Sequence, residues 1–99
     1  MITTIRTAVI APGKTSDAIA FANQMVKLAK EKYGKTVTLL MPVGGNPGRI
    51  AWLATYESLA EWEALMAKVM ADAEYWEAVA KNSATFLPGS VNDEFWRTI

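Results

Sequence analysis

The stretch that decides the fold is residues 49–66, which read RIAWLATYESLAEWEALM. Apolar and aromatic side chains on alternate positions predict a β-strand over residues 49–57. Ser58 and Glu61 then match a capping box, in which the Ser hydroxyl accepts from the backbone three residues on and the Glu reaches back. The stretch therefore predicts a strand that passes directly into a helix.

Outward from this stretch, the pattern predicts one more secondary-structure element on the C-terminal side and three on the N-terminal side. The Ser58 helix breaks at Ala71-Asp72, continues from Asp72 and stops at Pro88-Gly89. The other predicted elements are a strand over 2–10, a helix over 15–33 ending at Gly34, a strand over 36–43, a five-residue turn over 44–48 and a last strand over 91–99.

The element order is strand, helix, strand, strand, helix, strand. This order predicts one α+β domain over residues 1–99 with a ferredoxin-like βαββαβ sandwich, in which a four-stranded antiparallel sheet carries two helices on one face. The other face is left without a helix, although strands 36–43 and 49–57 place apolar side chains on both of their faces. We therefore expect a homodimer in which two sheets pack face to face.

The composition excludes several kinds of chemistry. The chain has no Cys and no His, which excludes disulfides, thiolate nucleophiles, His-based triads and sites with Cys or His ligands. Ten basic residues balance ten acidic ones, so there is no positive excess for nucleic acid. We expect no metal, no cofactor, no nucleic-acid partner and no membrane segment, since no apolar run approaches ~20 residues. The expected location is the cytoplasm.

Arg6 lies in the middle of the first predicted strand, where a charge is costly to bury unless it is paired. It either lines a pocket and meets a ligand, or pairs with a carboxylate across the sheet or the dimer contact. Both interpretations stay open from the sequence.

Large aromatic residues gather in the second half of the chain. They either line an apolar pocket or fill the core and the dimer interface. The candidate ligand-binding residues are Arg6, Trp52, Tyr56, Trp62 and Trp76, in a pocket between the second helix and the sheet or in the lumen of the barrel. No catalytic residue is assigned.

Three segments resemble NIPSNAP-like proteins. Residues 2–14 resemble the opening strand with its Arg-Thr pair and Pro-Gly-Lys turn, residues 52–61 the third strand and entry to the second helix, and residues 72–76 the Asp-Pro-Glu-Trp region. Two positions differ: Trp62 replaces a basic residue, and Ala73 replaces the Pro. The resemblance implies a dimeric α+β barrel, a group that also holds cofactor-free monooxygenases and haem-degrading enzymes.

We expect a NIPSNAP-like dimeric barrel protein that binds or transforms a small apolar or aromatic molecule. The alternative is a cofactor-independent monooxygenase resembling the enzymes that form polyketide quinones. Haem degradation is disfavoured because no His can act as an axial ligand. The element order also permits an RNA-binding domain. RNA binding is disfavoured because the first strand has no aromatic residue and the chain has no basic surface.

Overall fold

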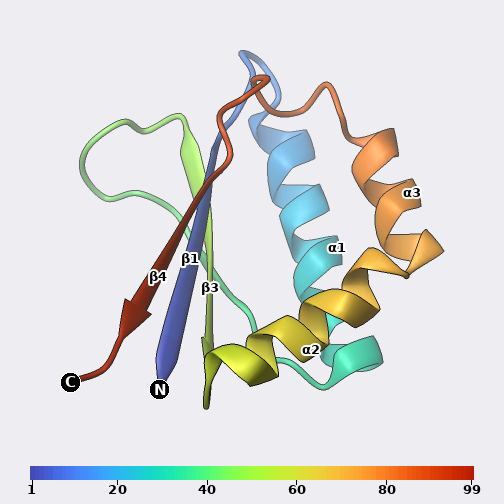
Figure 1. Cartoon of the computed structure of the whole chain (residues 1–99). Coiled ribbons are helices and arrows are strands. Elements are labelled where there is room, and N and C mark those ends of the chain that lie inside the picture. The colour runs from blue at the N-terminus through green and yellow to red at the C-terminus, as the bar shows by residue number, and fades with distance from the viewer.

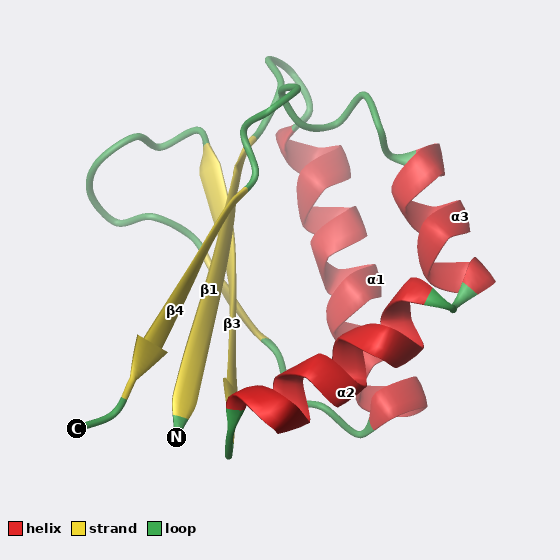
Figure 2. Ribbon diagram, viewed as in Figure 1, coloured by secondary structure: helices red, strands yellow, loops and turns green.

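The computed structural model describes residues 1–99 and contains a four-stranded antiparallel sheet with the order β2-β3-β1-β4. The elements follow one another as β1 (Ile2–Val9), α1 (Thr15–Tyr33), β2 (Thr38–Leu40), β3 (Arg49–Tyr56), α2 (Leu59–Met70), α3 (Ala73–Lys81) and β4 (Asn92–Arg97). All three helices lie on one side of the sheet, and the opposite face carries none (Figures 1 and 2). The predicted ferredoxin-like α+β architecture is confirmed, with its second helix divided into α2 and α3.

The well-packed part of the core lies where α1 crosses β1 and β3. Ile50 is fully buried there, and small residues on both layers surround it, including Ala8 of the sheet and Ala18 and Ala22 of α1. Alanine has little volume, so the helix backbone approaches the sheet closely at this point. Only 11 of the 99 residues are buried, which is few for a chain that is 52% hydrophobic. Much apolar surface therefore faces a cavity or the uncovered side of the sheet.

The capping box that starts α2 is formed. Ser58 Oγ accepts a hydrogen bond from the Glu61 backbone N–H at 3.2 Å, and Glu61 Oε2 accepts one from the Glu57 N–H at 2.8 Å. The returning carboxylate thus binds the N–H of the residue before the cap, where the chain leaves β3. This pair of bonds fixes the angle between strand and helix.

We expect Ser58→Ala to lower the free energy of unfolding by about 0.5–2 kcal/mol, because the cap satisfies a helix N–H that otherwise has no partner. Urea denaturation followed by circular dichroism measures the change. Ser83→Ala, in an exposed loop, is the control. Equal stability of the two variants would contradict the role of the cap.

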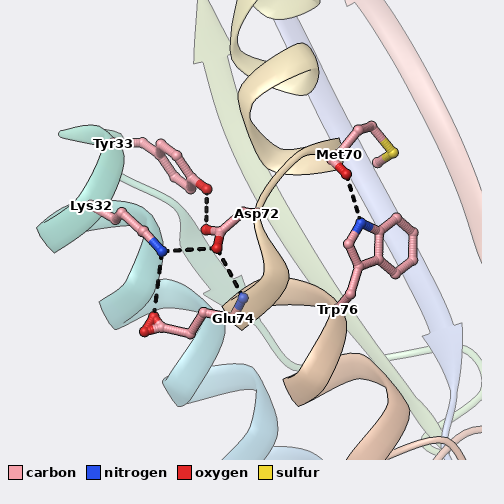
Figure 3. A network of polar contacts seen from close by, with 6 residues as sticks. All are labelled: Lys32, Tyr33, Met70, Asp72, Glu74 and Trp76. Atoms are coloured by element: carbon pink, nitrogen blue, oxygen red, sulfur yellow. Dashed lines mark hydrogen bonds and ion pairs between the residues drawn. The ribbon is translucent and has the colours of Figure 1, made fainter.

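Asp72 joins three helices at one point (Figure 3). Its carboxylate is 7% exposed, caps α3 by accepting from the Glu74 N–H at 3.0 Å, and accepts from Lys32 Nζ at 2.8 Å. The Tyr33 hydroxyl donates to its second oxygen. The predicted break at Ala71-Asp72 is confirmed, and the same side chain ties the end of α1 to the junction between α2 and α3.

All four predicted strands were too long. The strand expected over 36–43 contains only Thr38–Leu40, because it is an edge strand and Pro42 has no N–H to donate to the ladder. The last strand, expected over 91–99, is Asn92–Arg97 at the other edge. β1 ends at Val9 and β3 at Tyr56, each one residue earlier than expected; Ile10 retains a single bridge to Phe86.

The predicted end of the second helix at Pro88-Gly89 was wrong. α3 ends at Lys81, and the Asn82 side chain Nδ2 donates a hydrogen bond to the Ala78 carbonyl at 2.8 Å. The chain beyond it runs beside the end of β1, where the Ala11 N–H donates to the Thr85 carbonyl and the Leu87 N–H to the Val9 carbonyl. Pairing with β1 thus competes with helix from residue 83 onward.

Candidate ligand-binding cavity

A cavity of about 240 Å³ lies between the sheet and the three helices. Sixteen of its twenty lining residues are hydrophobic, and they come from every layer of the fold. β3 contributes Trp52, Ala54 and Tyr56, while α1 and α2 supply several Met, Leu, Val and aromatic side chains. The cavity is therefore an apolar chamber with aromatic walls.

The cavity exists because α2 stands away from the sheet. None of the α2 side chains is buried, although Trp62, Leu65 and Val69 all point to the cavity side. The Trp62 ring contacts Phe95 of β4 edge to face, with 4.8 Å between ring centroids. This contact bridges α2 and the edge strand across the cavity, so the helix is held over an unfilled space.

Arg6 points to the helix side of β1 and lines the cavity. Its Nε and Nη2 donate to the two oxygens of Asp93 at 2.7 and 2.8 Å, which is a bidentate pair between neighbouring strands. The bond to Asp93 raises the pKa of Arg6 above its usual range, and the same bond lowers the pKa of Asp93. Arg6 is thus both paired with a carboxylate and adjacent to a cavity.

Lys35 is the second cation at the cavity wall, and it is also engaged. Its Nζ donates to the Thr55 carbonyl, lies 3.6 Å from Glu61 Oε1 and sits 3.7 Å from the centre of the Tyr56 ring. Burial raises the pKa of Tyr56. These contacts connect the cavity wall to the start of α2.

Four of the five residues predicted from the sequence lie together around the cavity: Arg6, Trp52, Tyr56 and Trp62. Trp76 does not. It is 45% exposed, and its Nε1 donates to the Met70 carbonyl at 2.9 Å, so it covers the end of α2 instead (Figure 3). α3 begins after its cap residue Asp72, and this start places Tyr75, not Trp76, on the side of the helix that faces the cavity.

Sequence reasoning missed Asp93 and the contribution of α1, and it chose Trp76 instead of its neighbour Tyr75 as a site residue. The signal for Asp93 was weak: a carboxylate on the last strand becomes a partner for Arg6 only once the register between β1 and β4 is known. The α1 residues, such as Met25 and Tyr33, lie on the apolar face of a predicted helix. Such a face looks the same whether it packs on a sheet or lines a cavity.

One polar atom in this region has no partner. The Trp52 indole N–H is buried and makes no hydrogen bond. Trp52 is opposite Arg6 in the β1–β3 register, so this donor belongs to the same part of the sheet. Buried donors without a partner are rare and costly, which makes this one notable.

Other kinds of site have little support in the structure. No group of three or more Asp or Glu side chains is arranged to hold a metal ion. None of the helices combines the length and apolarity needed to cross a membrane.

Comparison with solved structures shows which proteins share this fold. Atu4242 from Agrobacterium tumefaciens, described as a NIPSNAP family protein with unknown function, superimposes with a TM-score of 0.84 at 17% identity, over 100% of this chain and 94% of that one. The chain has the NIPSNAP fold. An uncharacterised NIPSNAP domain protein from Burkholderia xenovorans matches with a TM-score of 0.83 at 14% identity, over 100% and 95% of the two chains.

A second kind of neighbour shares the NIPSNAP fold at lower similarity. A putative antibiotic biosynthesis monooxygenase from Deinococcus radiodurans has a TM-score of 0.73 at 9% identity, over 99% of this chain and 92% of that one. No family model and no curated protein matches the sequence. The resemblance inferred from three sequence segments is therefore confirmed as a likeness of fold, and its activity stays unassigned.

Proposed function

We propose that this NIPSNAP-like chain binds, or transforms, a small apolar or aromatic molecule in the cavity between its sheet and helices. The observation that carries the proposal is the chamber of about 240 Å³ with sixteen hydrophobic lining residues in a domain of 99 residues. A few convergent polar groups in an apolar chamber are the usual design of a small-molecule site. A ligand that fills the cavity would cover its apolar walls and stabilise the fold by mass action.

The test uses N-phenyl-1-naphthylamine, a neutral probe whose fluorescence rises in an apolar site. Ala29 lines the cavity from α1, whereas Ala20 on the same helix is exposed. We expect the wild type and Ala20→Phe to bind the probe, and Ala29→Phe to lose at least about tenfold in affinity, because the new ring occupies the ligand's space. Equal binding by the two variants would place the probe elsewhere and reject the proposal.

A cofactor-independent monooxygenase is the second candidate. It is supported by the fold shared with the Deinococcus protein named as a putative antibiotic biosynthesis monooxygenase, and by Trp, Tyr and Arg side chains around one apolar cavity. Such chemistry would take anthrone and O₂ to anthraquinone and water, with the substrate's reduced carbon as the electron source. Oxygen uptake with anthrone tests this candidate. Uptake above the uncatalysed rate by the wild type and Ala20→Phe, but not by Ala29→Phe, would support it. No uptake above background by the wild type would reject it.

We also propose a homodimer that covers the open face of the sheet. Leu40, Leu53 and Ile5 lie on that face, and Trp96 adds a side chain that is 59% exposed. The loop over 41–48 projects away from the helices (Figure 1) and carries the fully exposed Val43. Sedimentation equilibrium at micromolar concentration decides between a dimer and a monomer; a stable monomer rejects the proposal.

The absence of Cys supports a reducing compartment such as the cytoplasm.

A further inference from the structure

We infer that the cavity takes a neutral aromatic molecule with a carbonyl group, and discriminates against carboxylates, because Asp93 already balances the charge of Arg6. The inference rests on the proposed function and adds the chemical class of the ligand.

The guanidinium of Arg6 is half used. It has five N–H donors, and Asp93 accepts two of them, one from Nε and one from Nη2. Three donors are left, two on Nη1 and one on Nη2. A ligand carboxylate would bring a second negative charge beside Asp93, whereas a carbonyl oxygen accepts a hydrogen bond without that repulsion.

Lys35 does not supply a spare positive charge. Its ammonium is 3.6 Å from Glu61 and donates to the Thr55 carbonyl, with the Tyr56 ring against it. Both cations at the wall therefore have carboxylate partners. An anion placed between them would meet the negative charges of Asp93 and Glu61 without gaining an unpaired countercharge, which is unfavourable.

The unused polar atoms near Arg6 are mainly donors. Three of these donors are the free N–H groups of Arg6. The Trp52 indole N–H, on the strand next to Arg6, also has no partner, but it is fully buried and a ligand in the cavity does not reach it. Tyr75 also lies close enough to Arg6 to contribute to its raised pKa. A ligand that places an acceptor here would complement the free N–H groups of Arg6, whereas a ligand that offers only donors would leave them unsatisfied.

The volume limits the size of the molecule. A cavity of about 240 Å³ is larger than the ~150 Å³ chamber that accommodates benzene and smaller than the ~300–1,000 Å³ typical of drug-sized ligands. Molecules of two or three aromatic rings are the appropriate scale. The Met and aromatic side chains of the walls suit flat, polarisable ring systems.

The experiment displaces N-phenyl-1-naphthylamine with three naphthalenes of one shape: 2-acetylnaphthalene, 2-naphthoate and 2-ethylnaphthalene. In the wild type we expect the ketone to bind about tenfold more tightly than the carboxylate and severalfold more tightly than the hydrocarbon, since a hydrogen bond to a charged donor supplies the difference. A carboxylate that binds as tightly as the ketone would overturn the inference.

Variants show whether Asp93 sets this order. Asp93→Asn leaves Arg6 uncompensated, so we expect 2-naphthoate to gain at least about tenfold on the ketone. Glu63→Gln removes the same charge from the exposed side of α2 and should keep the wild-type order. An unchanged order in Asp93→Asn, with circular dichroism showing a folded protein, would overturn the inference.

The two levels of the proposal fail differently. If the probe binds and Ala29→Phe abolishes that binding, but the carboxylate is preferred, the cavity is a ligand site and only the ligand class is wrong. If Ala29→Phe leaves probe binding unchanged, the cavity itself is not the site. The order in which the three naphthalenes displace the probe is measured on the wild type. The inference can therefore be overturned even if Asp93→Asn does not fold.

Discussion

Ile50→Ala is expected to lower the free energy of unfolding by about 2–5 kcal/mol. Ile50 is fully buried between Ala8 of the sheet and Ala18 and Ala22 of α1, and such small, closely packed neighbours cannot reach into the space that the substitution leaves. Small domains hold only about 5–15 kcal/mol in total, so this loss is a large share of the stability. Urea denaturation measures it directly.

Ile19→Ala is the matched control for this substitution. Ile19 lies on α1 near the core helix positions but is 38% exposed, so the same change there should stay within about 0.5 kcal/mol. Similar losses for the two variants would mean that the contact between α1 and β3 is not the principal core. A large loss for Ile50→Ala alone would separate the packed part of the fold from the cavity.

The second large effect is expected at Asp72, and it depends on pH. Hydrogen bonds from Lys32 and Tyr33 lower the pKa of Asp72 to about 2 from the ordinary 3.8. Because the folded-state pKa is below the unfolded value, the ionised carboxylate stabilises the fold fully above pH ~4, and this contribution disappears as the pH falls toward 2. Lowering the pH should therefore weaken the contact between α1 and α3 at Asp72 (Figure 3).

Two substitutions separate the charge of Asp72 from its capping role. Asn is as good an N-cap as Asp, so Asp72→Asn removes the ion pair with Lys32 and keeps the cap, whereas Asp72→Ala removes both. At pH 7 we expect both variants to unfold at a temperature several degrees below that of the wild type, with the larger decrease for Asp72→Ala. The gap between wild type and Asp72→Asn should close between pH 4 and pH 2.

Asp17→Asn is the control, since Asp17 is exposed in the first turn of α1. Thermal unfolding followed by circular dichroism across this pH range provides the measurement. A gap that stays constant with pH would show that the Asp72 charge does not stabilise the fold. The neighbouring Tyr33 lines the cavity, so ligand affinity of Asp72→Asn would also report whether this contact holds the chamber in shape.

The sequence by itself determined the local structure of this chain. Element order follows from periodicity, the start of α2 from Ser58 and Glu61, the break before α3 from Asp72, and the end of α1 from Gly34, which adopts the left-handed conformation with φ of 65°. Each of these depends on side chains and backbone groups within a few residues of one another, so short-range chemistry is sufficient.

Strand lengths and the site needed the tertiary structure. β2 and β4 are edge strands, and where such a strand stops depends on its single neighbour. Arg6 meets Asp93 across 87 residues of sequence, and only the register between β1 and β4 brings them together. The cavity arises from the distance between α2 and the sheet, because the same apolar helix face would serve equally well in a closed core.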